Sequence, residues 1–175
     1  AKRFQYERFI LSQLLVMALK GVPAFYLPAL LASENDIKSF SMTGQRRDLN
    51  REKFKSENLL AVLNNPESNA NKNLKYLRNA MDVRSELKQF HPCSEMKCLS
   101  KGRSDIVVIK RSKGPESVFA IHNMTENKIN YQLNDNDLPK IIDNDFNTHD
   151  FLTSTKYNCK NISLDPFQVI WLSAL

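Results

Sequence analysis

The segment TGQRRDLNREKF, residues 43–54, carries the side chains in this sequence that are best suited to binding chemistry. It follows the apolar run GVPAFYLPALLAS, so charged groups cluster where the chain leaves a buried element. An arginine at that place could turn inward and present its planar donor fork to an oxygen-rich ligand. The alternative is a solvated helix start with Asp48 or Asn50 as the N-cap, which the local sequence by itself favours.

The charge balance limits the partners that we expect. The 175 residues suffice for one ordinary domain or two small ones, and 42% hydrophobic with 25% charged residues predicts a folded chain. The net charge is +6, but 25 Lys and Arg are interleaved with 19 Asp and Glu, which is not the pattern of a nucleic-acid-binding stripe. The basic segment KRSKG, residues 110–114, predicts a hairpin tip.

Cysteine usage bears on the compartment and on metal binding. Cys93, Cys98 and Cys159 form no even disulfide framework, so we expect a cytoplasmic protein, and the polar start AKRFQYERF lacks a signal-peptide pattern. His91 stands near a C-x4-C pair, but a structural zinc site needs a second pair of ligands, and none follows. We therefore expect ordinary thiols, no metal and no cofactor.

The N-terminal third predicts a helix followed by a strand. Residues 9–31 are long enough to span a membrane, but Lys20, Gly21, Pro23 and Pro28 interrupt them, so we expect no membrane contact. Residues 2–19 predict a helix that is apolar almost all round and covered on most sides. The next segment, residues 22–31, predicts a strand buried on both faces of a parallel sheet. No second such strand follows, which suggests a piece of a larger α/β fold.

The rest of the chain predicts two helices and then a β domain. Helices are expected at residues 50–64 and 71–89. After them come short β-branched runs separated by turn residues: DIVVIKR, SVFAIHNMT, KINYQL, DFLTS and FQVIWLS. Their spacing is typical of a small antiparallel sandwich. We therefore predict one domain at residues 1–92 and an all-β domain at residues 93–175.

The order of these segments resembles the C-terminal end of a sucrose phosphorylase-like enzyme of the α-amylase superfamily, glycoside hydrolase family 13. The matching pieces are GVPAFY, the pair Asn35-Asp36, RRDLNR and the closing LDPFQVIWL. The resemblance implies an α/β plus all-β fold, in which a last helix and the eighth strand of a (β/α)8 barrel precede an antiparallel β-sandwich. It also implies a retaining glucosyl transfer to phosphate, by two carboxyl groups about 5 Å apart.

The resemblance places those carboxylates on earlier barrel strands, so we assign no catalytic residue. Asp36, Asp48, Glu52 and Glu57 are interpreted as surface or capping groups. Arg47 matches the arginine that lines the family's glucosyl subsite, which makes it the predicted substrate-binding residue.

The doubled arginine leaves Arg46 as the alternative, whereas Asn50 is expected to cap the following helix. Pro28 departs from the family pattern, in which Gly or His is common. Sucrose, a sucrose phosphate and a glucosylglycerate-type substrate therefore stay open.

Three alternatives accompany this interpretation. The parent could be a hydrolase or a transglucosylase on the same scaffold. The chain could instead be a binding or structural module, with Trp171, Tyr131 and Tyr157 as sugar-stacking aromatics, although aromatic residues at strand spacing are usually core residues. The expected partners are a sugar and inorganic phosphate. Residues 4–31 are expected to pack against another copy of the chain or against further barrel segments.

Overall fold

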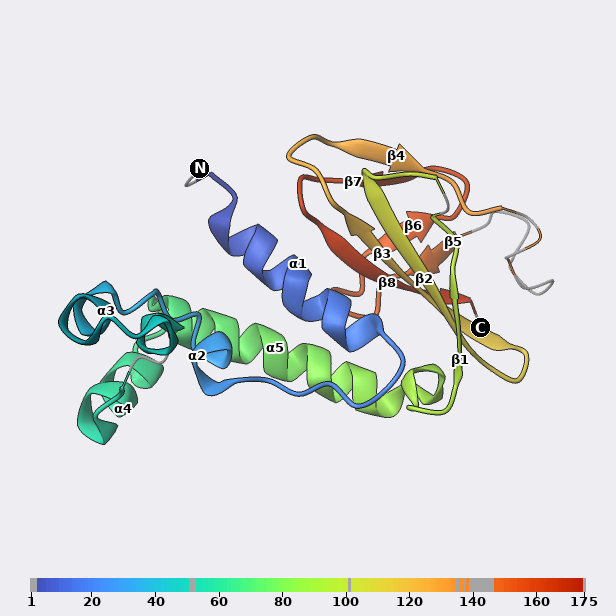
Figure 1. Cartoon of the computed structure of the whole chain (residues 1–175). Helices are drawn as coiled ribbons and strands as arrows, with labels where there is room; N and C mark the ends of the chain where they lie inside the picture. The colour runs from blue at the N-terminus through green and yellow to red at the C-terminus, as the bar shows by residue number, and fades with distance from the viewer. Residues whose placement is uncertain are drawn as a thin grey trace. The chain divides into compact units, whose positions relative to one another are not determined.

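The structure, a computed structural model, describes residues 3–50, 53–100, 102–134, 136, 138 and 147–174. The chain forms two compact units, which are described separately: Ala1–Pro23 with Ala80–Leu175, and Ala24–Asn79. Figure 1 shows the order of the elements. Helix α5 (Asn69–Glu86) belongs to the second unit at its start and to the first at its end.

The first unit is built on antiparallel strands, as predicted. Four of them form one sheet in the order β1-β2-β3-β8: Glu95–Cys98, Ile106–Lys113, Glu116–Asn123 and Val169–Ala174. Two short pairs complete the strands, β4 (Ile129–Tyr131) with β7 (Ile162–Leu164) and β5 (Asn147–His149) with β6 (Lys156–Asn158). The predicted antiparallel β domain is thereby confirmed.

The β2–β3 connection confirms a hairpin but corrects the position of its tip, because residues 110–113 still pair within β2 and only Gly114 of the predicted segment lies in the loop. Lys113 pairs with Glu116, which leaves Gly114 and Pro115 as a two-residue loop. Gly114 has a φ of 61°, whereas the proline ring holds φ negative, so only the first loop residue takes the left-handed region. A two-residue loop of this kind is a type II′ turn, which suits the twist of the paired strands.

Alternation along the strands gives the sheet two apolar faces. One face packs against β7 and its neighbours, and the fully buried members of this core include Ile106, Val108, Phe119, Ile121, Ile162, Leu164, Ile170 and Leu172. The opposite face carries Trp171, whose ring centroid lies 4.7 Å from that of Phe90 in the short helix η2 (Lys88–Phe90). Both faces are therefore covered, one by strands and one by helices (Figure 1).

Helix α1 (Gln5–Ala18) confirms the first predicted helix but not its burial. It buries one face, formed by Ile10, Leu11, Leu14, Met17 and Ala18. Tyr6 and Val16 of the helix and its C-cap residue Leu19 remain exposed within the described chain, so the expected cover on most sides stays a prediction about a second copy or further barrel segments. Both faces of α1 therefore carry apolar residues, but only one face is packed against the rest of the unit.

The second unit contains short helices and no strand among its described residues. They are α2 (Leu27–Leu30), α3 (Ile37–Thr43), the 3-10 helix η1 (Arg46–Asn50), α4 (Ser56–Asn64) and the first part of α5. Residues 22–27, predicted as the eighth barrel strand, pair with no strand within the described ranges; Tyr26 is extended and α2 follows at once. A strand needs a partner for its backbone groups, and Pro28 suits the first turn of a helix.

Two guanidinium groups, those of fully buried Arg111 and half-buried Arg84, bind the C-terminal end of α1 in the first unit. Arg111 of β2 is fully buried and donates to four backbone carbonyls, those of Ala18, Leu19, His91 and Glu95. Arg84 of α5 donates to the carbonyls of Met17, Gly21 and Phe90. The C-terminal carbonyls of α1, which have no partner within the helix, thus receive charged donors.

The region after residue 146 corrects one predicted strand. Residues 150–154, DFLTS, form a turn, because Asp150 accepts hydrogen bonds from Leu152 N and the Thr153 hydroxyl at 3.2 and 2.7 Å. Such local bonds to an aspartate carboxylate favour turns over strands. Strands β1, β5, β6 and β7 were not predicted. The predicted domain boundary between residues 92 and 93 stays a prediction. The compact unit that holds the sheet also includes α1 and residues 80–92.

Self-association through residues 4–31 is our first prediction. Val16 of α1 and its C-cap residue Leu19 are each 43% exposed, and Val22 is 81% exposed. We expect the purified chain to sediment as an oligomer, and Val16→Glu with Leu19→Glu to shift it toward monomer. Leu60→Glu, at a 61% exposed residue of α4, is the matched control and should leave the sedimentation unchanged. A cooperative monomer of the unmodified chain would contradict the prediction.

The buried imidazole of His122 in β3 predicts a pH dependence of stability. Burial lowers the pKa of His122 from 6.5 to about 4, and its Nδ1 lies 3.3 Å from Val107 O. The unfolded chain therefore binds a proton that the folded chain rejects. The contribution of His122 to the free energy of unfolding is fully present above pH 6.5. It is lost as the pH falls toward 4, by about 3 kcal/mol in total.

Urea unfolding of the chain at pH 7, 5.5 and 4.5 measures this loss. His122→Phe should flatten the dependence, whereas His149→Gln, at an exposed residue, should leave it as it is. Equal slopes for His122→Phe and the unmodified chain would show that other groups cause the effect.

Candidate functional site

The predicted site segments are brought together in the second unit. Asp36 N donates to Leu49 O at 2.7 Å, which ties the Asn35-Asp36 pair to the η1 turn that carries Arg47. Asp36 also caps α3, since its Oδ1 accepts from Ser39 N at 2.9 Å and its Oδ2 from the Ser39 hydroxyl at 2.5 Å. These bonds from Ser39 lower the pKa of Asp36. Its interpretation as a capping carboxylate is confirmed.

A compact turn fixes the start of η1. Gly44 closes α3 in the left-handed region, with φ 64°, and its N–H donates to Phe40 O at 2.8 Å. The Thr43 hydroxyl then donates to Asp48 Oδ2 at 2.6 Å, and Asp48 N donates to Gln45 O at 2.9 Å. Asp48 is therefore occupied inside the turn, as expected for a structural carboxylate.

Arg47 extends from this turn toward solvent. Its side chain is 67% exposed, and its Nε lies 4.0 Å from Asp48 Oδ1, a weak surface contact. The donor fork is thus available for a ligand. Arg46 is exposed as well, so exposure does not distinguish the two arginines. A hollow of about 490 Å³ near Asp36 is lined by Glu34–Lys38 and Lys53, and Arg47 is not among its lining residues.

The helix start predicted after this segment is corrected by the structure. Helix α4 begins at Ser56 with Lys55 as its N-cap residue, so Asn50 does not cap it. Asn50 instead ends η1, because the 3-10 turn continues through it. Glu57 lies in the first turn of α4, where its acidic side chain interacts favourably with the positive end of the helix dipole. Arg51 and Glu52 lie outside the described residues.

The aromatic residues considered for sugar stacking belong to the core. Trp171 is fully buried, which confirms its interpretation as a core residue, and its Nε1 has no hydrogen-bond partner among the described residues. Tyr131 and Tyr157 are partly buried against the strand core. The Tyr157 hydroxyl accepts from Gln168 Nε2 at 2.9 Å. Trp171 therefore offers no ring face to a sugar, and Tyr131 and Tyr157 are partly covered by the core.

The cysteines are free thiols in contrasting surroundings. Cys93 and Cys98 are exposed, whereas Cys159 is buried. Burial raises the pKa of Cys159 to about 11, which makes this thiol unreactive. Among the described residues no group of three potential metal ligands occurs, and no helix there is both long and apolar enough to cross a bilayer.

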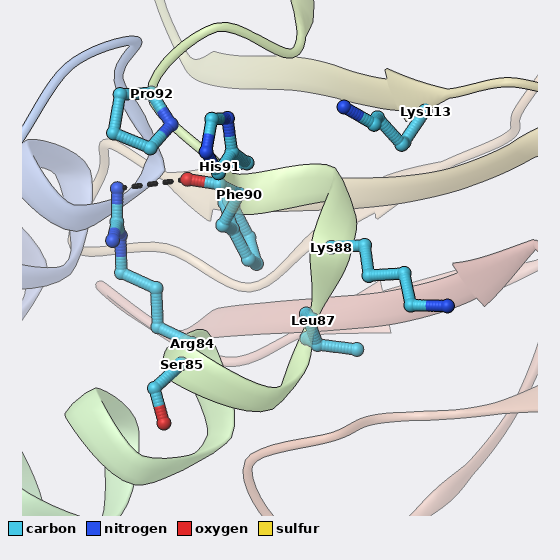
Figure 2. A pocket seen from close by; sticks show the side chains of 8 residues that line it. All are labelled: Arg84, Ser85, Leu87, Lys88, Phe90, His91, Pro92 and Lys113. Carbon is cyan, nitrogen blue, oxygen red and sulfur yellow. Dashed lines mark hydrogen bonds between the residues drawn. The ribbon is translucent and has the colours of Figure 1, made fainter.

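A second hollow, in the first unit, was not found by sequence reasoning. It measures about 340 Å³ and is lined by Arg84, Ser85, Leu87, Lys88, Phe90, His91, Pro92 and Lys113. Figure 2 shows Lys113 extending toward His91, while Arg84 reaches Phe90 O from α5. The lining combines four basic side chains with no carboxylate. The sequence carries no signal for it, because Lys113 is far from residues 84–92 along the chain.

The chain is similar in sequence and in fold to known proteins. No protein-family model matches the chain. Two curated relatives are both named glucosylglycerate phosphorylase. The one from Allomeiothermus silvanus is 30% identical over 126 residues, covering 72% of this chain and 22% of the relative. The one from Escherichia coli is 24% identical over 166 residues, covering 94% of this chain and 28% of the relative.

The fold comparison agrees with these relatives. The crystal structure of trehalose-6-phosphate hydrolase from Bacillus licheniformis superimposes with a TM-score of 0.69 at 16% identity, covering 99% of this chain and 40% of that one. The chain resembles the C-terminal segment of α-amylase superfamily enzymes. The antiparallel β domain predicted from this resemblance is confirmed, whereas the predicted eighth barrel strand does not form within the described residues. The chain spans about a quarter of the length of the two curated relatives.

Proposed function

We propose that this chain is the C-terminal part of a retaining, glucosyl-transferring glycoside phosphorylase of the α-amylase superfamily. In such a double displacement a carboxylate first attacks the anomeric carbon, while a carboxylic acid protonates the departing oxygen. A phosphate oxygen then displaces the carboxylate and yields an α-glucosyl phosphate. No residue of this chain is assigned to those two steps.

The structural support is the hydrogen bond from Asp36 N to Leu49 O at 2.7 Å. It joins the two segments, Asn35-Asp36 and RRDLN, that match the family near its glucosyl subsite. We propose Arg47 as the substrate-binding residue there, because its exposed guanidinium can donate two parallel hydrogen bonds to sugar hydroxyls or to a carboxylate. Arg46 is the alternative.

The names of the curated relatives favour a glucosylglycerate as the glucosyl donor, with sucrose as the second candidate. Phosphate is the proposed acceptor, and the cytoplasm is the proposed compartment. A hydrolase or transglucosylase on the same scaffold is the competing function, because one of the solved structures that superimpose on this chain is named a hydrolase.

Phosphate dependence of the full-length protein tests the proposed function. We expect glucosylglycerate to be converted to glucose 1-phosphate and glycerate only when inorganic phosphate is present. The measurement compares release of glucose 1-phosphate and of free glucose, with sucrose as a parallel substrate. Free glucose released at the same rate without phosphate would identify a hydrolase instead.

The role of Arg47 predicts a loss of glucosyl transfer on substitution. In the full-length protein Arg47→Lys keeps the charge but removes the planar donor fork. We expect kcat/KM to fall by the factor that corresponds to a loss of about 2 to 3 kcal/mol of transition-state stabilisation. Arg46→Lys is the matched control and should stay near the unmodified rate. The reverse result, with only Arg46→Lys impaired, would move the assignment by one residue; thermal unfolding of both variants checks that the fold persists.

A further inference from the structure

We propose that the hollow lined by Arg84, Lys88, His91 and Lys113 binds an oxyanion, either inorganic phosphate or the phosphate group of a small metabolite. This site belongs to the first unit and uses none of the residues assigned to sugar binding. It goes beyond the proposed glucosyl transfer, which requires no second phosphate site.

The charges around the hollow are unbalanced. Among the described residues no carboxylate pairs with Arg84 or Arg111, whose guanidinium groups bind only backbone carbonyls and both lie within 5.8 Å of the Phe90 ring centroid. The nearest acid in the hairpin, Glu116, accepts from Gln89 Nε2 at 2.8 Å. Arg111 is fully buried and Arg84, which lines the hollow, is half-buried; since a cation removed from water without a counter-ion is unfavourable, an anion in the hollow would stabilise this part of the fold.

The loop that forms the hollow is rigidly held before any ligand arrives. Lys88 O accepts from His91 N at 3.1 Å and from the Ser94 hydroxyl at 3.0 Å. His91 O accepts from Ser94 N at 2.9 Å and from Arg111 Nη2 at 2.8 Å. A preorganised loop loses little conformational freedom on binding, which favours affinity for a small ion.

His91 supplies a directed donor. Its Nδ1 accepts the backbone N–H of Cys93 at 3.2 Å, so the neutral ring carries its proton on Nε2. This N–H and the Lys113 ammonium are donors of the kind that surround phosphate oxygens in proteins. The Arg84 guanidinium, whose Nε and Nη2 already donate to carbonyls, adds its positive charge. In Figure 2 the Lys88 ammonium points away from Arg84, which places it at the rim of the hollow.

The size and lining of the hollow indicate the ligand class. About 340 Å³ exceeds what a lone phosphate ion fills and lies in the range of small-molecule sites. Leu87, Phe90 and Pro92 add an apolar wall beside the cationic groups. A phosphorylated sugar would use both parts, whereas inorganic phosphate would use the cationic part alone.

Equilibrium dialysis of the purified 175-residue chain against radiolabelled inorganic phosphate and glucose 6-phosphate tests the proposal, because it measures binding in any oligomeric state. We expect saturable binding of one anion per chain, and no binding of glucose. Lys113→Gln should weaken it about fivefold or more, and Lys88→Gln with Lys113→Gln further still. Lys156→Gln, with the same loss of charge on exposed strand β6, is the matched control and should stay within about twofold.

The dialysis results distinguish free phosphate from a phosphorylated metabolite, and a specific site from diffuse charge attraction. Tighter binding of glucose 6-phosphate than of phosphate supports a metabolite, and equal affinities support free phosphate. Equal weakening by Lys156→Gln and Lys113→Gln would overturn the proposal in favour of diffuse charge attraction, as would the absence of saturable binding. Loss of binding in Arg47→Gln alone would place the anion at the sugar segment instead. Since the dialysis needs no glucosyl transfer, its failure leaves the phosphorylase proposal intact.

Discussion

The first unit depends on two guanidinium groups that bind seven backbone carbonyls. Arg111 donates from the central part of the sheet, and Arg84 donates from the end of α5. Their acceptors come from the end of α1, the loop after it, the segment around η2 and the start of β1. Two stretches of chain far apart in sequence, residues 17–21 and 90–95, are thereby fixed to one another by charged donors.

This arrangement has an electrostatic consequence. Burial lowers the pKa of Arg84 and of Arg111, and the charge of Arg84 lowers the pKa of Arg111 further. Both nevertheless remain charged, and the carbonyl dipoles at the C-terminus of α1 offset part of that charge. A carboxylate partner would offset more, but the described residues provide none. The surplus of positive charge beside the η2 hollow follows from the same two residues that hold the unit together.

The candidate sugar segment follows a different principle. Its turn is fixed by short-range bonds, from Thr43 to Asp48 and from Ser39 to Asp36, while Arg47 stays in solvent. A local network of this kind positions the backbone precisely enough to direct one side chain, and it leaves that side chain free to meet a ligand. The proposed glucosyl subsite therefore needs groups from outside this segment to complete it, as the curated relatives of several times its length suggest.

Elements that follow from short-range sequence patterns could be predicted without the structure. Helix α1, helix α5, the β2–β3 hairpin and strand β8 were predicted because apolar periodicity, β-branched runs and a Gly-Pro turn act over a few residues. The order of short motifs also identified the family resemblance. Asp36 as a cap and Trp171 as a core residue were predicted for the same reason, since capping and strand alternation are short-range patterns.

Features that need partners far apart along the chain are visible only in the folded structure. Residues 22–27 have strand composition, yet no strand forms without a ladder partner, and Asn50 gave way to Lys55 as the residue before α4. Arg111 looks like a surface residue in KRSKG, but the carbonyls of α1 and η2 surround it. The hollow beside His91 likewise needs Lys113 from another strand. Backbone pairing, charge burial and cavities arise between residues far apart along the chain, so no local pattern records them.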